Sequence, residues 1–255
     1  MWRKTIIPKI YFYRELLLIS LKTSYKGSYI GALWIILTPI IHILTYVIFL
    51  VGIRGRVDNL LHLITSVVLF QVIAKSLGSA KTEKIQNFSL YSNTEKSHRT
   101  MLKSSILKNL VPSFLVLLFF YFLINISNII FNFNQIQPID LQTLLIITAS
   151  LPILFIYLNS LVVLINKFSS NFTDFNQALN FITRYMLFTS PVFWSGITGI
   201  SFVDYFIKLT NPVYFYFQFI YNTINKSIGF DFFSLLFPSI LFLLYLRYKE
   251  TITNE

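Results

Sequence analysis

The chain has 255 residues, of which 55% are hydrophobic and only 12% are charged, and its mean hydropathy is +0.66. Soluble domains carry about a quarter charged residues, so this composition excludes a single soluble domain, a disordered chain and a coiled coil, and it indicates a membrane protein. The absence of Cys excludes disulfides and thiolate metal sites. The net charge is +11. In a membrane protein, the distribution of Lys and Arg between the two sides predicts how the chain is oriented.

The first 29 residues are expected to form a cytoplasmic N-terminus with an amphipathic helix. Between residues 10 and 26, Glu15 and Lys22 fall on one helical face and Leu17 and Leu21 fall on another. Such a pattern predicts a helix lying at the inner membrane interface, and the alternative is a cytoplasmic helix packed on protein. The scattered charges before the first apolar run argue against a cleavable signal peptide.

Residues 30–255 are expected to form a single domain that crosses the membrane six times. A helix needs about 20 predominantly apolar residues to cross the hydrocarbon core. Apolar segments predict spans at about 31–51, 60–78, 110–130, 144–165, 175–194 and 227–246. Lys75 interrupts the second segment near one end, and Arg184 lies inside the fifth.

Residues 201–225 are rich in aromatic side chains but have too few consecutive apolar residues for a span. Asn211 and Pro212 interrupt this segment near its middle. The segment is therefore predicted to form short interfacial or re-entrant helices before the last span. The predicted fold is an all-α integral membrane protein with six transmembrane helices and an N-terminal amphipathic interfacial helix.

The distribution of Lys and Arg predicts the orientation of the chain. Most of the 21 basic residues fall in the N-terminal region, in residues 75–108 and at the C-terminus. Because basic loops stay in the cytoplasm, both termini and the polar segment 81–103 are expected on the inner side. An even number of spans follows from this arrangement.

Motifs for nucleotide hydrolysis and metal binding are missing from the sequence. No Gly-rich loop ends in Gly-Lys-Ser or Gly-Lys-Thr, so any ATP is expected to be handled by another chain. His42, His62 and His98 lie in different elements without ligand spacing, so neither a metal site nor a catalytic residue is assigned. Asp231 is the only acid in a predicted span, which disfavours proton-driven transport and membrane-embedded acid–base catalysis.

Several polar and aromatic residues are candidates for a substrate path. Arg184 lies about nine residues, or roughly 13 Å, into the fifth predicted span. Because an Arg there costs about 2.5–3.5 kcal/mol, it is expected to face protein or an aqueous cavity. It would contact an anionic substrate, pair with Tyr157, Asn159 or helix carbonyls, or reach an interface. Tyr157, Tyr214 and Tyr216 are candidates for stacking on sugar rings, although membrane interfaces account for most Tyr and Trp in such proteins.

One block is more specific than composition. It reads Tyr25-Lys26-Gly27-Ser28-Tyr29-Ile30-Gly31-Ala32-Leu33-Trp34, with Arg14-Glu15-Leu16 before it and Pro39 after it. The block resembles the signature of ABC-type (type-2) polysaccharide export permeases, which combine an interfacial helix, a basic-Gly turn and a Gly-x-x-Trp start of the first span. It is more similar to the O-antigen and teichoic acid branch than to the capsular one. The aromatic-Pro-basic run that is common in the family is missing between Tyr91 and Lys103.

This resemblance implies a permease subunit in the bacterial inner (cell) membrane that forms a homodimer and pairs with two copies of an ABC ATPase subunit. ATP and Mg would be bound by that partner, and this chain would bind no cofactor and no nucleic acid. The cargo would be a lipid-linked or lipid-anchored polysaccharide, with membrane lipids around the dimer. The interfacial helix and gate would involve Arg14, Tyr25, Lys26, Gly27, Gly31 and Trp34, and the ATPase contact would involve Lys84, Asn87, Phe88, Leu90 and Tyr91.

Three alternatives stay open at this stage. The polar segment 81–103 is either an ATPase contact or a solvated basic loop held by anionic headgroups, worth about 1 kcal/mol per basic residue. The chain could instead belong to an ABC exporter of lipids or drugs. A membrane-embedded enzyme of glycolipid assembly is the alternative from another class, and it would turn over substrate without an ATPase.

Overall fold

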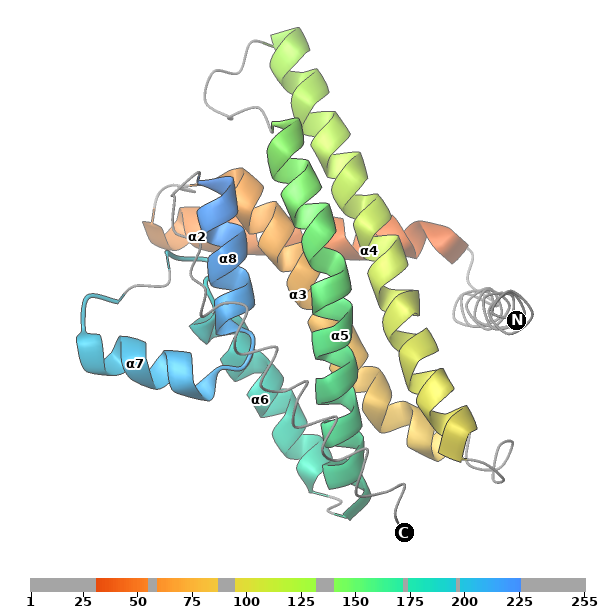
Figure 1. The fold of residues 1–255 in the computed structure, drawn as a ribbon. Helices are drawn as coiled ribbons and strands as arrows, with labels where there is room; N and C mark the ends of the chain where they lie inside the picture. The colour runs from red at the N-terminus through yellow and green to blue at the C-terminus, as the bar shows by residue number, and fades with distance from the viewer. Residues whose placement is uncertain are drawn as a thin grey trace.

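The computed structural model describes residues 31–54, 59–86, 95–131, 140–171, 174–195 and 198–225. Within these ranges all regular secondary structure is helical, with one short 3-10 helix followed by seven α-helices and no strand (Figure 1). The elements are η1 (Gly31–Leu33), α2 (Trp34–Arg54), α3 (Leu60–Gln86), α4 (Glu95–Phe131), α5 (Leu141–Asn171), α6 (Phe175–Thr189), α7 (Ser201–Thr210) and α8 (Tyr214–Ile224). The predicted N-terminal interfacial helix and the predicted sixth span lie outside the described residues.

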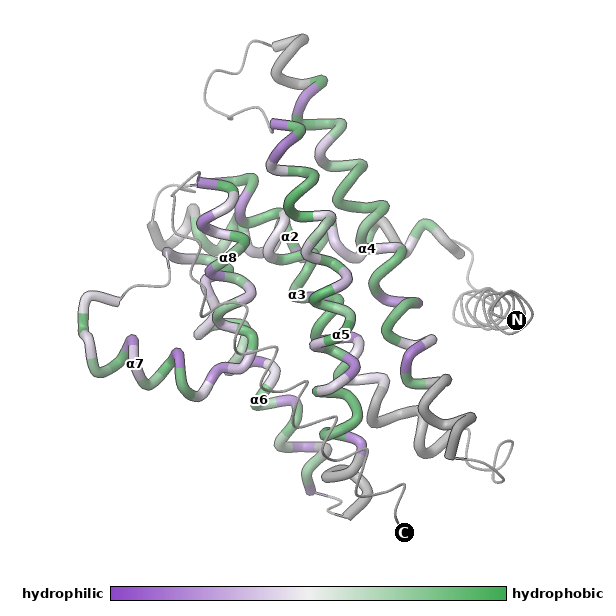
Figure 2. Tube along the Cα trace, in the orientation of Figure 1, coloured by the Kyte–Doolittle hydropathy of each residue, from purple (hydrophilic) through white to green (hydrophobic). Residues whose placement is uncertain are grey.

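Three of the described helices are long and apolar enough to cross a membrane. The apolar stretches are Leu60–Ser79 in α3, Leu102–Ile126 in α4 and Leu141–Asn166 in α5, and α2 has a shorter one at Leu37–Leu50. Figure 2 shows hydrophobic residues dominating the described parts of α4 and α5. These helices and the composition define a helical membrane protein, while the count of six spans stays a prediction.

Helix α3 is the centre of the described bundle. It packs against α4, α5, α2 and α8, and 78% of its apolar stretch is buried, against 22% for α4. Val68, Ile73 and Leu77 are fully enclosed, whereas Leu115 and Phe122 of α4 are exposed. A helix that is apolar all round belongs inside a bundle, and α4 offers an apolar outer face suited to lipid.

Helix α2 forms where the first span is predicted, but it takes a different direction from its neighbours. In Figure 1 it runs across α3, α4 and α5 rather than along them. It contacts α3 and α4 and leaves Ile41, Leu44 and Ile48 exposed. The helix itself is therefore observed, and its crossing of the membrane stays a prediction.

The fifth predicted span, residues 175–194, is wrong in its extent. Helix α6 ends at Thr189 after 15 residues, and turns and bends follow through Trp194. Ser190 is extended because it precedes Pro191, and a residue before proline is pushed out of the α region. A helix of this length covers about 22 Å, which is less than the hydrocarbon core of about 30 Å.

The aromatic segment 201–225 forms two short helices that meet at Asn211 and Pro212, as predicted. They have different environments. Helix α7 exposes Phe202, Tyr205 and Leu209, and hydrophobic and hydrophilic residues are mixed along it (Figure 2). Helix α8 packs against α3 and α5 and is largely buried. An interfacial position therefore suits α7, whereas α8 is part of the bundle interior.

Candidate functional site

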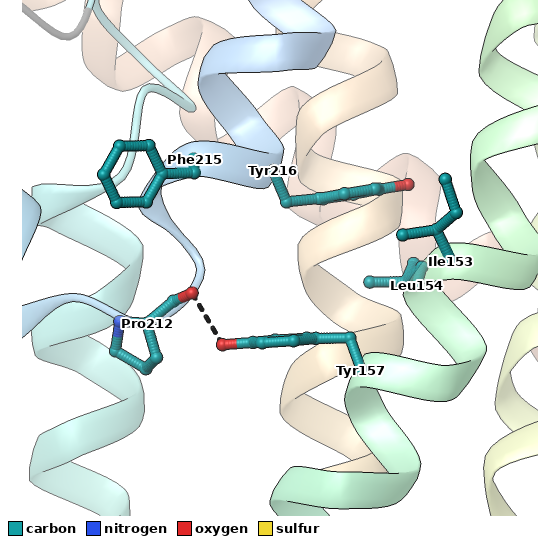
Figure 3. Close-up of a pocket in the computed structure, with 6 residues that line it drawn as sticks. All are labelled: Ile153, Leu154, Tyr157, Pro212, Phe215 and Tyr216. Carbon is teal, nitrogen blue, oxygen red and sulfur yellow. Dashed lines mark hydrogen bonds between the residues drawn. The ribbon is translucent and has the colours of Figure 1, made fainter. Parts of the chain in front are cut away.

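The junction of α5 with the start of α8 brings two of the predicted substrate-path tyrosines together. The hydroxyl of Tyr157 donates a hydrogen bond to the Pro212 carbonyl oxygen at 2.6 Å. The hydroxyl of Tyr216 lies 3.2 Å from Ser150 Oγ and shares a hydrogen bond with it. Figure 3 shows Tyr157 reaching from α5 to Pro212 while Tyr216 reaches from α8 back to α5. One tyrosine on each side of the junction therefore bonds to the other side.

A small cavity lies between these rings. It is lined by Ile153, Leu154, Tyr157, Pro212, Phe215 and Tyr216, and its water-accessible volume is about 10 Å³. A space of that size holds about one water molecule. Tyr157 is 4% exposed and Tyr216 is 8% exposed, so the described conformation holds no sugar there. In this conformation the two tyrosines fasten α8 to α5.

Asn211 is the hub that connects the end of α6 with the start of α8. Its Nδ2 contacts the carbonyl oxygen of Met186 at 3.2 Å, Thr189 Oγ1 at 2.7 Å and Ser190 Oγ at 2.9 Å. Its Oδ1 accepts a hydrogen bond from the backbone N–H of Val213 at 3.0 Å. The residue is fully buried. An amide that donates on one side and accepts on the other suits this turn, because it satisfies groups of two helices at once.

Two further contacts join α7 to its neighbours. The hydroxyls of Tyr185 and Thr210 are hydrogen-bonded, which ties the end of α7 to α6. The ammonium of Lys208 lies 6.0 Å from the ring centroid of Tyr214, a cation–π distance. Tyr214 itself is buried. Polar contacts therefore link helices α6, α7 and α8 around Asn211, where the chain is not helical.

The turn before α7 is held by a carboxylate. Thr198 donates two hydrogen bonds to Asp204 Oδ1, from its backbone N–H at 2.8 Å and from Oγ1 at 2.6 Å. Gly199 has φ +83°, which permits the chain to turn back onto the helix. The Thr198 side chain first, and then its backbone N–H, hold the pKa of the Asp204 carboxyl below its usual value.

Of the other three candidates for the substrate path, Tyr214 is buried at the start of α8, and none of the three lines the small cavity. Arg184 is exposed on α6, and Asn159 is half-buried on α5. Pairing with Tyr157 is one of the alternatives for Arg184, and the hydrogen bond that the Tyr157 hydroxyl donates goes to the Pro212 carbonyl oxygen. The role of Arg184 in a substrate path stays a prediction.

The predicted gate and the predicted ATPase contact are described only in part. Gly31 has φ +53° in η1, a left-handed conformation that favours glycine, and Trp34 is exposed at the start of α2. Lys84 lies in the last turn of α3. Outside the described residues lie Arg14, Tyr25, Lys26, Gly27, Asn87, Phe88, Leu90 and Tyr91.

Sequence reasoning missed two residues of the junction. Asn211 was identified only as a break in the aromatic segment, and Ser150 was not identified at all. The Asn-Pro pair within an apolar aromatic segment was the available signal for Asn211, because a buried amide requires partners. Ser150 gave no such signal, since its partner Tyr216 is 66 residues away in the sequence.

No protein-family model matches the chain, and no curated protein matches it either. The class that the fold and composition define is a helical membrane protein. Among the described residues, no group of three or more His, Asp or Glu side chains is placed to hold a metal ion. What the chain does must therefore be argued from its own residues.

Proposed function

We propose that this chain is the transmembrane permease subunit of an ATP-driven ABC exporter that moves a lipid-linked or lipid-anchored polysaccharide across the bacterial inner membrane. An O-antigen type of glycan is favoured over a capsular one. The observation that carries the proposal is the block from Tyr25 to Trp34, which resembles the start of such permeases. The left-handed conformation of Gly31, the first residue of η1, gives a physical reason for glycine at that position.

The described helices support a permease that receives motion from the cytoplasmic side. The apolar stretch of α3 ends at Ser79, but the helix continues to Gln86, and α4 begins at Glu95 before its apolar stretch starts at Leu102. Each extension is about seven residues, or roughly 10 Å. A partner that pushes on these polar ends would act directly on α3, the central helix, because an α-helix transmits displacement along its axis.

The sequence of the extensions suits a protein contact. Lys81, Lys84, Lys96 and Arg99 lie in the polar ends of α3 and α4. Since the chain has no nucleotide-binding loop, the ATPase is a separate subunit in this proposal, present in two copies beside a homodimer of this chain. The basic extensions are the proposed place of contact, with residues 87–91 between them.

The proposal is tested by co-purification of the chain with the ATPase subunit. Charge reversal by Lys84→Glu should abolish co-purification while membrane insertion is unchanged, because Lys84 lies at the proposed contact. Lys208→Glu is the matched control, since Lys208 is exposed on α7, away from the extensions. Equal recovery of the ATPase with both variants would remove the α3 extension from the contact.

A second assay separates the proposal from its alternatives. Loss of the chain should remove surface polysaccharide, and the purified chain alone should show no turnover of glycolipid. ATPase activity stimulated by small amphiphiles, with surface polysaccharide unchanged, would instead indicate an exporter of lipids or drugs.

A further inference from the structure

Two polar stripes face each other where α3 meets α8. On α3, His62 and Ser66 share one face, and Asn59, directly before the helix, continues their spacing of three and four residues. On α8, Gln218 and Tyr221 share one face, and Asn225, directly after the helix, continues it in the same way. We refer to these six residues as the α3–α8 seam. Helices α3 and α8 are packed neighbours.

Two contacts determine how the stripes are aligned. Asn59 Nδ2 donates a hydrogen bond to Asn225 Oδ1 at 2.8 Å. The rings of His62 and Tyr221 meet edge to face, with centroids 4.9 Å apart. Because the sequence numbers rise along one stripe while they fall along the other, the helices are antiparallel here. With this alignment, Ser66 lies opposite Gln218. Both residues are one helical turn from the His62–Tyr221 contact, on the side away from Asn59 and Asn225.

The part of the seam formed by His62, Ser66 and Gln218 contains polar atoms without partners. Within the described part of the chain, His62 Nε2, Ser66 Oγ and Gln218 Oε1 are buried and make no hydrogen bond. His62 is 4% exposed and Ser66 is fully buried. Buried polar atoms without partners are uncommon because they lose their bonds to water and gain nothing in return.

The three atoms have complementary roles. His62 Nε2 accepts a hydrogen bond in one neutral tautomer of the imidazole and donates one in the other. Gln218 Oε1 is an acceptor, and Ser66 Oγ either donates or accepts. The seam therefore presents one acceptor and two groups that take either role.

We propose that the α3–α8 seam is a buried water site, in which water binds His62 Nε2, Ser66 Oγ and Gln218 Oε1. A water molecule has two hydrogens and two lone pairs, so it can satisfy Gln218 Oε1, the Ser66 hydroxyl and His62 Nε2 in either neutral tautomer of His62. Buried waters in proteins make two to four such bonds. The Asn59–Asn225 hydrogen bond marks one end of the seam. Asn59 lies seven residues before Ser66, or roughly 10 Å along the helix axis.

The site gives α8 two different faces. Toward α5, the Ser150–Tyr216 hydrogen bond holds α8, and the Tyr157–Pro212 hydrogen bond holds the residues just before it. Toward α3, α8 presents the polar seam beside the Phe70–Phe217 ring contact. This inference does not depend on the proposed exporter function.

The sign of a stability change tests whether the site is wet. Ser66→Ala removes one partner of the water, so the Tm of the full chain in detergent should fall by about 2–4 °C. If the site is dry, the same change removes an unsatisfied hydroxyl and the Tm rises or stays constant, which overturns the proposal. The matched control is Ser160→Ala on α5, because Ser160 is equally buried but donates to the Ile156 carbonyl oxygen at 3.1 Å.

Radiolytic hydroxyl-radical labelling gives a second, independent readout on the full chain. Radicals form from water, so His62 should be oxidised in the wild type despite its burial. Ser66→Val fills the space beside His62, and the oxidation of His62 should then drop severalfold. Equal labelling of His62 in both proteins overturns the proposal.

Discussion

The loss of the Asn211 side chain should destabilise the protein more than any exposed Asn substitution. In Asn211→Ala the backbone N–H of Val213 loses its acceptor, and Val213 is fully buried. An orphaned buried donor costs about 1–3 kcal/mol, and the lost donations to Thr189 and Ser190 add about 1 kcal/mol net. The carbonyl oxygen of Met186 stays satisfied because the Ser190 N–H also bonds it at 3.0 Å. The expected loss is therefore about 2–4 kcal/mol.

This loss is measurable by thermal unfolding in detergent. A destabilisation of about 2–4 kcal/mol lowers the Tm of a chain of this size by about 4–16 °C. Asn180→Ala is the matched control, since Asn180 is exposed on α6 and its loss should change the Tm by less than about 2 °C. Equal Tm shifts for the two variants would refute the role of Asn211 as the hub between α6 and α8.

Three further predictions concern the other contacts of this region. Tyr157→Phe removes the hydrogen bond to Pro212 and should cost about 0.5–1.5 kcal/mol in chemical unfolding, and an unchanged unfolding midpoint would show that this bond does not stabilise the α5–α8 contact. Because the pKa of Asp204 is lowered on folding, the stability that this carboxylate contributes is present above the ordinary carboxyl pKa of about 4 and is lost as pH falls through the lower folded value. A carboxyl NMR titration should show that depressed pKa in the wild type and a return toward the ordinary value in Thr198→Val, and identical titrations would contradict the account of the α7 turn. Arg184→Leu should assemble normally but reduce glycan export severalfold, and full export would leave Arg184 without a role in the substrate path.

Much of the described secondary structure follows from runs of apolar residues. The apolar stretches of α3, α4 and α5 lie close to the predicted spans because a charge-free run of about 20 residues has few stable alternatives to a helix. The break at Asn211 and Pro212 was predicted from local backbone chemistry. Such features depend only on neighbouring residues, so they are visible in one sequence.

The end of α6 shows where apolar composition is misleading. Pro191 disfavours a helical Ser190, and this local signal outweighed the apolar residues that follow it. The α5–α8 junction and the α3–α8 seam were not predictable for a different reason. Tyr157 and Pro212 are 55 residues apart, and Asn59 and Asn225 are 166 apart. Which faces of apolar helices meet is decided by packing across the whole bundle, and the periodicity of a single helix does not encode it.

The most direct test of the proposed function is the fate of the glycan when the chain is removed from its native cell. We expect that lipid-linked polysaccharide accumulates on the inner leaflet, that surface polysaccharide disappears, and that the wild-type chain restores it only together with an ATPase subunit. Unchanged surface polysaccharide after removal of the chain, or ATP hydrolysis by the purified chain alone, would contradict the proposal.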